Sequence, residues 1–398
     1  MIDFSKYETD AHSYDGSDAK RSIYIYGKYY MVKLPNDDYS SPNPQQTSVS
    51  SNVISEYVGS HIMQEVIGLE TQITLLGYWG DQIAVACEDF REEGYELHEF
   101  SWYLQNVIPK NQIGRIPTYE QLYRVFNECK FLQGIREASI ERYWDMIVGD
   151  ALLGNFDRHK DNFGFLTNKD KKNIIPAPIY DCGGCLYPSL SEDKFEEILS
   201  SAVEIEKRIY EFPKIALNRN SNKNNEDKFG YFELLSSNFD KELTKAFFGI
   251  YPRINMKKVF SIIDNTPFIS DKRKHFYKQI LTYRKEMILD KSYEILTELP
   301  EVKGNRDFYF ARCPQGTKSE TSNLQQGQAQ NDFDYSFGVL EEDEDFLFSE
   351  AVRLEQEKSK MMGKPICEYD REKQAPYLLY PDGSRKYPTL KDQSKDKK

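Results

Sequence analysis

Residues 154 to 165 read Gly-Asn-Phe-Asp-Arg-His-Lys-Asp-Asn-Phe-Gly-Phe, and no other stretch of the chain says as much about its fold. The segment before it, Glu137 to Leu153, places apolar residues three and four apart, which predicts a helix with one buried face. The pair Gly154-Asn155 is expected to end that helix. The polar residues Asp157 to Asn162 are therefore expected on a loop directly after a buried helix.

The spacing of polar residues in this loop favours phosphoryl transfer. Asp157 and Asn162 stand five positions apart with an Arg-His pair between them. In such a loop the aspartate accepts the proton of the attacking hydroxyl, and the asparagine amide oxygen holds a magnesium ion. Because magnesium prefers oxygen ligands, a second carboxylate is expected nearby in space. Asp181 can supply it, since it lies between a short apolar strand at 174–180 and a glycine pair at 183–184. A lone aspartate beside glycine is usually a turn residue, but the two motifs in this order are far more specific.

Residues 1–92 are expected to form a small lobe rich in β-structure. A β-hairpin is predicted from Ser22 to Leu34, where two β-forming runs flank a turn that contains Gly27. The other features predicted here are a Ser/Pro/Asn/Gln-rich loop at 36–52, a helix at 54–66 with apolar residues four apart, and strands at 72–76 and 82–87.

Residues 93–303 have a mainly helical pattern. Besides the helix before residue 154, helices are predicted at Lys194–Tyr210, Lys228–Phe248 and Lys272–Leu299. A small sheet-rich lobe followed by a larger helical region places the chain in the α+β class.

Beyond residue 303 the composition changes again. A flexible linker is expected over 304–332, where Gln, Ser, Thr and Gly predominate. The tail at 333–398 is too short for a core of its own, so it is expected to dock on the main body or to stay mobile. Its predicted features are the acidic stretch Glu341–Asp345, a helix at Phe346–Met361, and a hairpin at Pro365–Tyr387 around Pro381-Asp382-Gly383.

The composition argues against several classes of protein. The chain has 52 basic and 64 acidic residues and a net charge of -12, so a nucleic-acid partner is not expected. No run reaches the roughly 18 apolar residues of a membrane span. Met1–Asp10 lacks the features of a signal peptide, which predicts a cytoplasmic protein or one exported without a cleavable signal. The six cysteines are expected to be reduced, and Cys182 and Cys185 lack the further ligands that a structural zinc site needs.

The loop at 154–165 resembles the catalytic loop of HipA-like kinases, which that family writes Asn-x-Asp-x-His-x-x-Asn. It is also similar to the Asp-Arg-His-x-x-Asn loop of phosphoinositide lipid kinases. The phrases at 55–62 and 75–78 resemble the CtkA-type branch of bacterial Ser/Thr kinases. The resemblance spans about residues 14–300 and implies a two-lobed protein-kinase-like fold, with a β-rich nucleotide-binding N-lobe, a larger helical C-lobe and a C-terminal appendage.

The resemblance also implies ATP and Mg²⁺ as cofactors, with Asp157 as the catalytic aspartate and with Asn162 and Asp181 as metal ligands. Lys33 is similar to the phosphate-binding lysine of the family, and Glu56 on the following helix is expected to pair with it. The remaining residues expected at the nucleotide are Gly16, Ser17 and Lys20 in a glycine-containing phosphate loop, Glu88 and Phe90 in the hinge that meets adenine, and His159 and Lys160 in the catalytic loop.

Some of these roles stay open at the level of sequence. His159 is expected to hold the loop more than to act as a base, and Lys160 either touches the γ-phosphate or is solvated. The phosphate loop departs from the family pattern, because Asp15 and Asp18 flank a single glycine. Acids beside phosphates are unfavourable unless they turn away or pair with a cation.

The implied function is transfer of the ATP γ-phosphoryl group to a serine or threonine hydroxyl of a protein substrate, with autophosphorylation. The hydroxyl-rich loop at 36–52 is the expected self-modified segment, because it joins the Lys33 strand to the Glu56 helix. Two alternatives stay open. A lipid kinase would share the Asp-Arg-His loop, although no basic membrane-facing cluster stands out. A nucleotide-binding pseudokinase scaffold would share the fold, although the full set of polar site residues argues against it.

Overall fold

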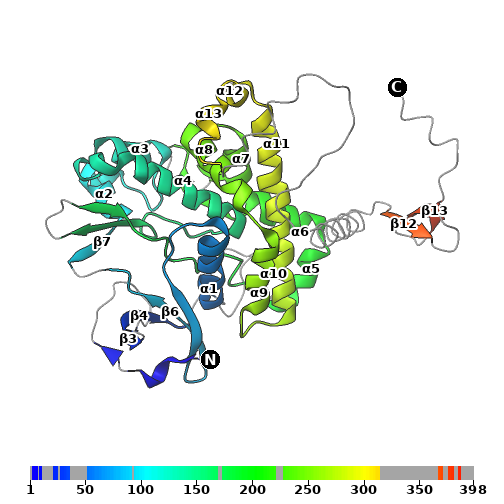
Figure 1. The fold of residues 1–398 in the computed structure, drawn as a ribbon, viewed down its shortest axis with the longest axis horizontal. Helices are drawn as coiled ribbons and strands as arrows, with labels where there is room; N and C mark the ends of the chain where they lie inside the picture. Colours follow the sequence, from blue (N-terminus) through cyan, green and yellow to red (C-terminus); the bar gives the residue numbers. More distant parts are fainter. Residues whose placement is uncertain are drawn as a thin grey trace. The chain divides into compact units, whose positions relative to one another are not determined.

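A computed structural model describes residues 2–7, 9–10, 21–25, 27–35, 52–91, 94–168, 173–220, 227–313, 366–370, 375–380 and 384–386. The chain divides into two compact units. The first comprises residues 1–199 and 204–320 and contains the two lobes (Figure 1). The second comprises residues 200–203 and 321–398.

The N-lobe is built on a six-stranded sheet with the order β1-β5-β6-β4-β3-β2. β3 and β4 form the predicted hairpin, with Gly27 in its turn at a φ of 81°. The sheet buries Phe4, Ile23, Val32 and neighbouring alanines in one apolar cluster. The strands are β1 (Ile2–Asp3), β2 (Thr9–Asp10), β3 (Arg21–Ile25), β4 (Lys28–Lys33), β5 (Thr74–Trp79) and β6 (Gln82–Glu88).

Helix α1 (Asn52–Ile62) connects this sheet to the C-lobe. It starts two residues before its predicted position and continues as a π-helical turn over Met63–Ile67, which ends at Gly68 in a left-handed conformation. Val58 and Ile62 are fully buried. The helix packs on β5 and β6 and also on α9 (Met256–Asn265), so it lies between the sheet and the helical body (Figure 1).

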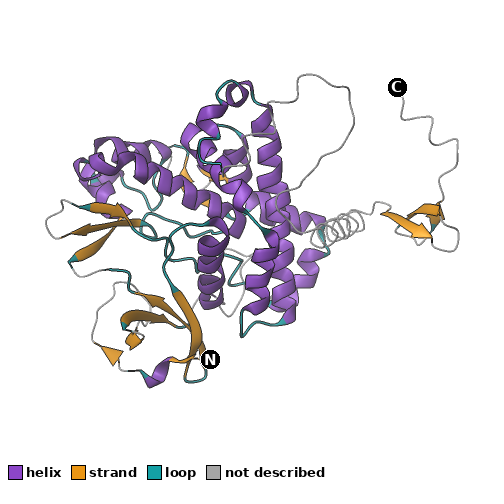
Figure 2. Ribbon diagram, in the orientation of Figure 1, coloured by secondary structure: helices purple, strands orange, loops and turns teal. Residues whose placement is uncertain are grey.

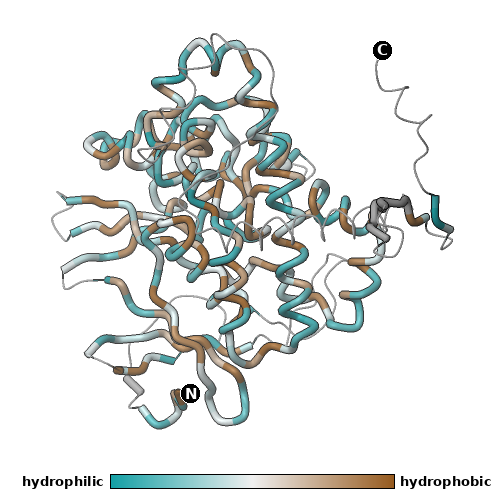
Figure 3. Tube along the Cα trace, turned by 45° about the vertical axis from the view of Figure 1, so that its right-hand side comes forward, coloured by the Kyte–Doolittle hydropathy of each residue, from teal (hydrophilic) through white to brown (hydrophobic). Residues whose placement is uncertain are grey.

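The C-lobe is organised around α4 (Arg136–Leu153), the helix predicted before the loop at 154–165. Its apolar face is fully buried, and Gly154 ends it with a φ of 66°. Hydrophobic and hydrophilic stretches alternate along the chain of the C-lobe (Figure 3), which contains further helices (Figure 2). These are α2 (Phe100–Val107), α3 (Tyr119–Glu128), α5 (Phe195–Leu199), α6 (Ala202–Glu206), α7 (Tyr231–Ser236), α8 (Lys241–Ile250), α10 (Asp271–Arg284), α11 (Lys291–Glu298), α12 (Pro300–Lys303) and α13 (Arg306–Tyr309).

Two of the three further helices predicted in the C-lobe are wrong, because each predicted segment is broken into separate elements. The segment 194–210 is broken at Ser200-Ser201, between α5 and α6. The segment 228–248 begins as a strand, β11 (Lys228–Gly230), and is interrupted again at Asn238, whose left-handed φ of 48° stops the helix. Asp240 then starts α8 by accepting hydrogen bonds from two backbone N–H groups. Local apolar spacing continues across these breaks, which is why the pattern missed them. The third prediction, at 272–299, is confirmed by α10, a π-helical turn and α11.

The folded C-lobe continues past residue 303, where the linker is predicted to begin. Tyr309 on α13 is buried, and Phe310 stacks on Phe248. Arg312 forms a two-point ion pair with Asp145 of α4 at 2.6 and 2.7 Å. These contacts fix the chain against the helical body as far as Cys313.

The C-terminal unit contains a small antiparallel sheet of β12 (Ile366–Asp370), β13 (Ala375–Leu379) and β14 (Arg385–Lys386). β13 and β14 form the predicted hairpin around residues 381–383, and β12 adds a strand on its other side. The helix predicted at 346–361 lies outside the described residues.

The loop at 154–165 runs into β8 (Gly164–Asn168), the middle strand of a three-stranded sheet with β7 (Tyr95–Glu99) and β9 (Ile174–Pro176). Gly164 opens β8 opposite Glu99. A Cβ atom at residue 164 would lie only 2.3 Å from the carbonyl oxygen of His98 and 2.8 Å from the Cα of Glu99. Both neighbours are backbone atoms, so only glycine allows this close approach.

We expect Gly164→Ala to destabilise the protein by about 1–3 kcal/mol or more, because the backbone of β7 must move away from the new methyl group. The matched control is Gly134→Ala, since no atom lies within 4 Å of a Cβ placed there. Urea denaturation followed by circular dichroism compares the two. Equal stability of both variants would show that β7 and β8 are not held at this distance.

Candidate active site

A buried ion pair holds the loop at 154–165. Arg158 donates to the carboxylate of Asp150 on α4 with its Nε at 2.9 Å and its Nη2 at 3.3 Å, and both side chains are almost completely buried. The same guanidinium donates to the carbonyl of Asn162 at 2.9 Å and to that of Tyr180. Burial opposes the charge, but Asp150 raises the pKa of Arg158 well above its usual value. One side chain thus ties the loop to the segment that carries Asp181.

The backbone N–H and carbonyl of Asp157 are both hydrogen-bonded within the loop, and its carboxylate takes no part in these bonds. Its N–H donates to Asn155 Oδ1 at 3.0 Å, and its carbonyl accepts from Asn162 Nδ2 at 2.7 Å and from the His159 N–H at 2.7 Å. The side chain remains 37% exposed. Partial burial raises the pKa of Asp157; His159 opposes this rise and Asp181 adds to it.

His159 and Lys160 are both engaged within the protein. The N–H of Asp161 donates to His159 Nδ1 at 3.2 Å, which in the neutral ring places the proton on Nε2. That Nε2 lies 3.7 Å from Asp157 Oδ1. Lys160 Nζ donates to the carbonyls of Gly114 at 3.3 Å and Arg115 at 2.9 Å. Lys160 therefore anchors the segment before α3, a role that the sequence did not predict.

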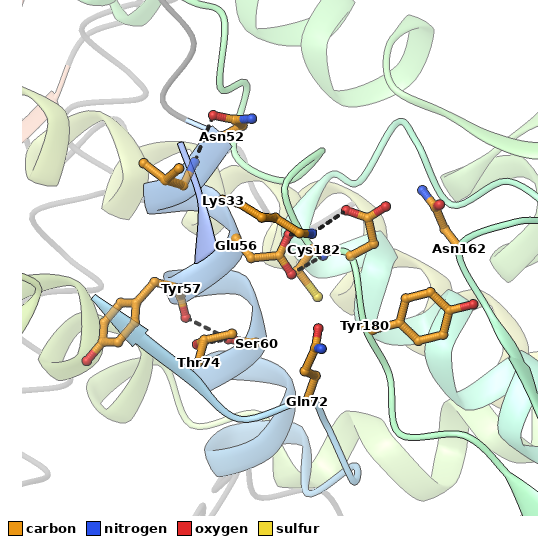
Figure 4. Close-up of polar contacts among 12 residues, drawn as sticks. Lys33, Asn52, Glu56, Tyr57, Ser60, Gln72, Thr74, Asn162, Tyr180 and Cys182 are labelled. Atoms are coloured by element: carbon orange, nitrogen blue, oxygen red, sulfur yellow. Dashed lines mark hydrogen bonds and ion pairs between the residues drawn. The ribbon is translucent and has the colours of Figure 1, made fainter. Parts of the chain in front are cut away.

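The predicted ion pair between Lys33 and Glu56 is confirmed. Lys33 Nζ lies 3.1 Å from Glu56 Oε2 and 3.3 Å from Asp181 Oδ1, so β4, α1 and the segment after β9 meet at one ammonium group (Figure 4). Glu56 Oε1 accepts from the N–H of Cys182 at 2.9 Å. Burial opposes the charge on Lys33, but Asp181 and Glu56 raise the pKa of Lys33 well above its usual value. Although burial raises it, the pKa of Asp181 is lowered overall, chiefly by Lys33.

The segment 181–184 packs closely against α1 and the loop. Asp181 has a left-handed φ of 57°, a conformation uncommon for residues other than glycine but more accessible to aspartate. A Cβ at Gly59 would lie 2.9 Å from that of Cys182. A Cβ at Gly184 would lie 2.9 Å from that of Asp157 and 2.7 Å from Asn155 Oδ1. These glycines let the two segments reach contact distance.

The donor set offered by Asn162 and Asp181 fits a magnesium ion. The amide nitrogen of Asn162 is used by the carbonyl of Asp157, which turns Oδ1 away from that bond. The lowered pKa of Asp181 keeps its carboxylate ionised. Magnesium takes few protein oxygens and completes its octahedron with waters and phosphates.

The predicted hinge residues lie at the end of β6. The N–H of Glu88 donates to the carbonyl of Ile73 at 2.8 Å, and its carbonyl accepts from Gln72 Nε2 at 2.9 Å. The N–H of Phe90, by contrast, makes no hydrogen bond with any residue that the structure describes. The Phe90 ring packs on Tyr180 with centroids 5.8 Å apart. The predicted phosphate-loop residues Gly16, Ser17 and Lys20 lie outside the described residues.

Comparisons with known proteins agree with this geometry. The chain is 37% identical over 285 residues to serine/threonine-protein kinase CtkA of Helicobacter pylori, which covers 70% of this chain and 83% of that protein. A crystal structure of that proinflammatory kinase superposes with a TM-score of 0.67 at 36% identity, covering 75% of this chain and 99% of the other. The chain belongs to the CtkA-type serine/threonine protein kinases. HipA of Shewanella oneidensis, solved with HipB and operator DNA, gives a TM-score of 0.46 at 15% identity over 72% of this chain and 67% of that one. No family model matches the sequence.

Membership of this family confirms the predicted two-lobed, kinase-like α+β fold, with a curled sheet in the N-lobe and helices in the C-lobe. It also favours a protein kinase over the lipid-kinase and scaffold alternatives. Within the described residues, no helix has the length and apolar character needed to span a bilayer.

The buried residues that hold the catalytic loop in place were not predicted from the sequence. Asp150 and Asn155 bond to each other at 3.1 Å, and both are buried. Asp150 could have been noticed because, like Asp145, it is a carboxylate among the apolar residues in the second half of α4. Cys182 and Cys185 are free, buried thiols, and burial raises the pKa of Cys185 well above its usual value, so neither has the exposure of a reactive cysteine.

We expect Asp150→Asn to destabilise the kinase by about 3–5 kcal/mol, because it leaves the Arg158 guanidinium buried without a counter-charge. The matched control is Asp264→Asn. Asp264 pairs with Lys278 at 2.6 Å but is 52% exposed, and removing such a surface pair costs about 1 kcal/mol or less. Urea denaturation measures both. A cost for Asp150→Asn no larger than that of the control would contradict the supporting role of this pair.

Proposed function

We propose that this protein is an ATP-dependent serine/threonine kinase that transfers the γ-phosphoryl group to a hydroxyl of a protein substrate. The observation that carries the proposal is the convergence of three segments on Lys33, whose ammonium group contacts both Glu56 and Asp181. In protein kinases the corresponding lysine–glutamate pair must form before phosphates are positioned. The name of the CtkA relative supports serine and threonine as acceptors.

The chain's own residues would divide the work as follows. Lys33, held by Glu56, would bind the nucleotide phosphates, and the free N–H of Phe90 would meet the adenine edge. Asn162 and Asp181 would hold Mg²⁺, which neutralises charge on the phosphates when bound. Asp157 would orient the acceptor hydroxyl and take its proton as the oxygen bonds to the γ-phosphorus and the bond to ADP breaks. Gly16, Ser17 and Lys20 would line the phosphates from the N-lobe, and His159 would steady the Asp157 carboxylate.

We expect Asp157→Asn to keep Mg-ATP binding but to lower phosphoryl transfer by about 100-fold or more, in line with the usual contribution of a general base. Transfer from radiolabelled ATP to protein and to phosphoinositide vesicles is measured beside nucleotide affinity. Asp264→Asn, far from the loop and on the surface, should retain wild-type activity. Retention of more than about a tenth of the activity by Asp157→Asn would refute the role of Asp157. Labelling of the vesicles alone would favour a lipid kinase, and nucleotide binding without any transfer would favour a scaffold.

We further propose autophosphorylation in the loop between β4 and α1. The candidate hydroxyls lie outside the described residues, and the proposal rests on their sequence position between Lys33 and Glu56. They are Ser40, Ser41, Thr47, Ser48, Ser50 and Ser51. A phosphate there would add about −1.5 to −2 charges close to the nucleotide site and so alter activity.

Mass spectrometry of the active enzyme and of the Asp157→Asn variant, each purified from the same host, tests this proposal. We expect phosphate on at least one of these hydroxyls in the active enzyme and none in the variant. Equal modification of both proteins, or phosphate only elsewhere in the chain, would rule out self-modification of this loop.

A further inference from the structure

Three cations gather beside Asp157 on the C-lobe. Arg115 precedes α3, Lys214 opens β10 (Lys214–Asn218), and Lys228 opens β11. Arg115 is exposed and the two lysines are half-buried. Arg115 and Lys228 both interact with the charge of Asp157, and Lys214 interacts with Lys228. We call Arg115, Lys214 and Lys228 the cationic rim.

Backbone and side-chain bonds fix the rim against the catalytic loop. Lys160 of the loop holds the carbonyls of Gly114 and Arg115. The strand β10 bonds to the same segment, because the N–H of Asn218 donates to the carbonyl of Pro117 at 2.9 Å. Lys228 pairs directly with Asn218 across the β10–β11 ladder, so both side chains lie on one face.

The other end of the hairpin is also tied to the loop. Tyr231, which follows β11, donates its hydroxyl proton to the carbonyl of Asn155 at 2.7 Å. Asn155 in turn holds the N–H of Asp157. The segments that carry the rim are therefore held against the catalytic loop.

Apart from the nearby Asp157, the rim cations face no acidic partner at ion-pair distance among the described residues. Among the described residues, Arg115, Lys214 and Lys228 form no ion pair, and their charged groups donate no hydrogen bond. The neighbouring Arg219 differs, since it pairs with Asp227 and with Glu233. Burial and then the charges of Arg115 and Lys214 lower the pKa of Lys228, whereas the charge of Asp157 opposes this shift. Like charges held together in this way are relieved when an anion binds between them.

We propose that the cationic rim selects acceptor segments in which acidic or phosphorylated residues flank the serine or threonine. This inference rests on the proposed kinase function and names its substrate class. The rim lies on the C-lobe beside the carboxylate that would receive the acceptor proton, whereas the nucleotide phosphates are assigned to Lys33, Asn162 and Asp181. A flanking carboxylate or phosphate would then neutralise the rim while the hydroxyl reaches Asp157.

The test compares synthetic peptides with one central serine and flanks of alanine, glutamate, phosphoserine or lysine. We expect wild-type kcat/KM to be about tenfold or more higher for the glutamate or phosphoserine peptide than for the alanine peptide. The ratio of kcat/KM between the glutamate and phosphoserine peptides tells whether the rim binds carboxylates or phosphates better. In the triple variant Arg115→Gln, Lys214→Gln, Lys228→Gln the preference should disappear, while the alanine peptide keeps its rate within about threefold.

A second triple variant, with glutamate at the same positions, should favour the lysine peptide. Lys130→Glu is the control, because this exposed, unpaired lysine lies beyond the far end of α3, roughly 15 Å along the helix. Equal rates of the wild type on all peptides, or an unchanged preference in the glutamine variant, would overturn the proposal. A rise in the KM for ATP in the glutamine variant, seen with every peptide, would also overturn the proposal, because the rim would then serve the nucleotide. Failure of the wild type to label any peptide or itself would instead overturn the proposed function on which it rests.

Discussion

The buried bond between Arg158 and Asp150 is the constraint on which the site depends. A guanidinium and a carboxylate are costly to remove from water, and the pair is tolerated only where every donor finds a partner. Here the remaining Arg158 donors reach the carbonyls of Asn162 and Tyr180 and the sulfur of Cys182. The partners come from the end of α4, from the loop itself and from the segment after β9. Tyr180 and Cys182 lie 22 and 24 residues from Arg158 in the sequence, so local structure alone could not hold their segment beside the loop.

The segment around Asp181 is held from two sides. Arg158 binds it from the C-lobe, whereas Glu56 binds the N–H of Cys182 from α1. Asp181 sits between these two anchors with a left-handed backbone, and its carboxylate faces Lys33. A strained backbone persists only where its surroundings determine it strongly, as they do here. The position of α1 and the conformation of Asp181 are therefore coupled, so that the two lobes share one polar network.

The sequence predicted those features that depend on neighbours in the chain. The β3–β4 hairpin, α4 with its glycine end and the loop after it all follow from short-range spacing. Pairing of Lys33 with Glu56 was predicted through family resemblance, not through spacing. The anchoring role of Lys160 depends on a tertiary contact, which periodicity does not contain. The break at Asn238 is a local left-handed turn that apolar spacing does not register. For the same reason Asp150 looked like one polar residue on an apolar helix, although it is the partner of Arg158.

The net charge of a chain does not reveal where like charges gather locally. The chain as a whole carries −12, which argues against a broad anionic surface as partner. An electrostatic site, however, depends on charges within about 10 Å, because salt screens those that lie farther away. Arg115 and Lys228 come from segments that are far apart in the sequence and meet only because β10 bonds to the segment before α3. In a protein whose net charge is negative, a local group of cations beside Asp157 stands out against a field that on average repels acidic chains, and this contrast is what would give the proposed site its selectivity.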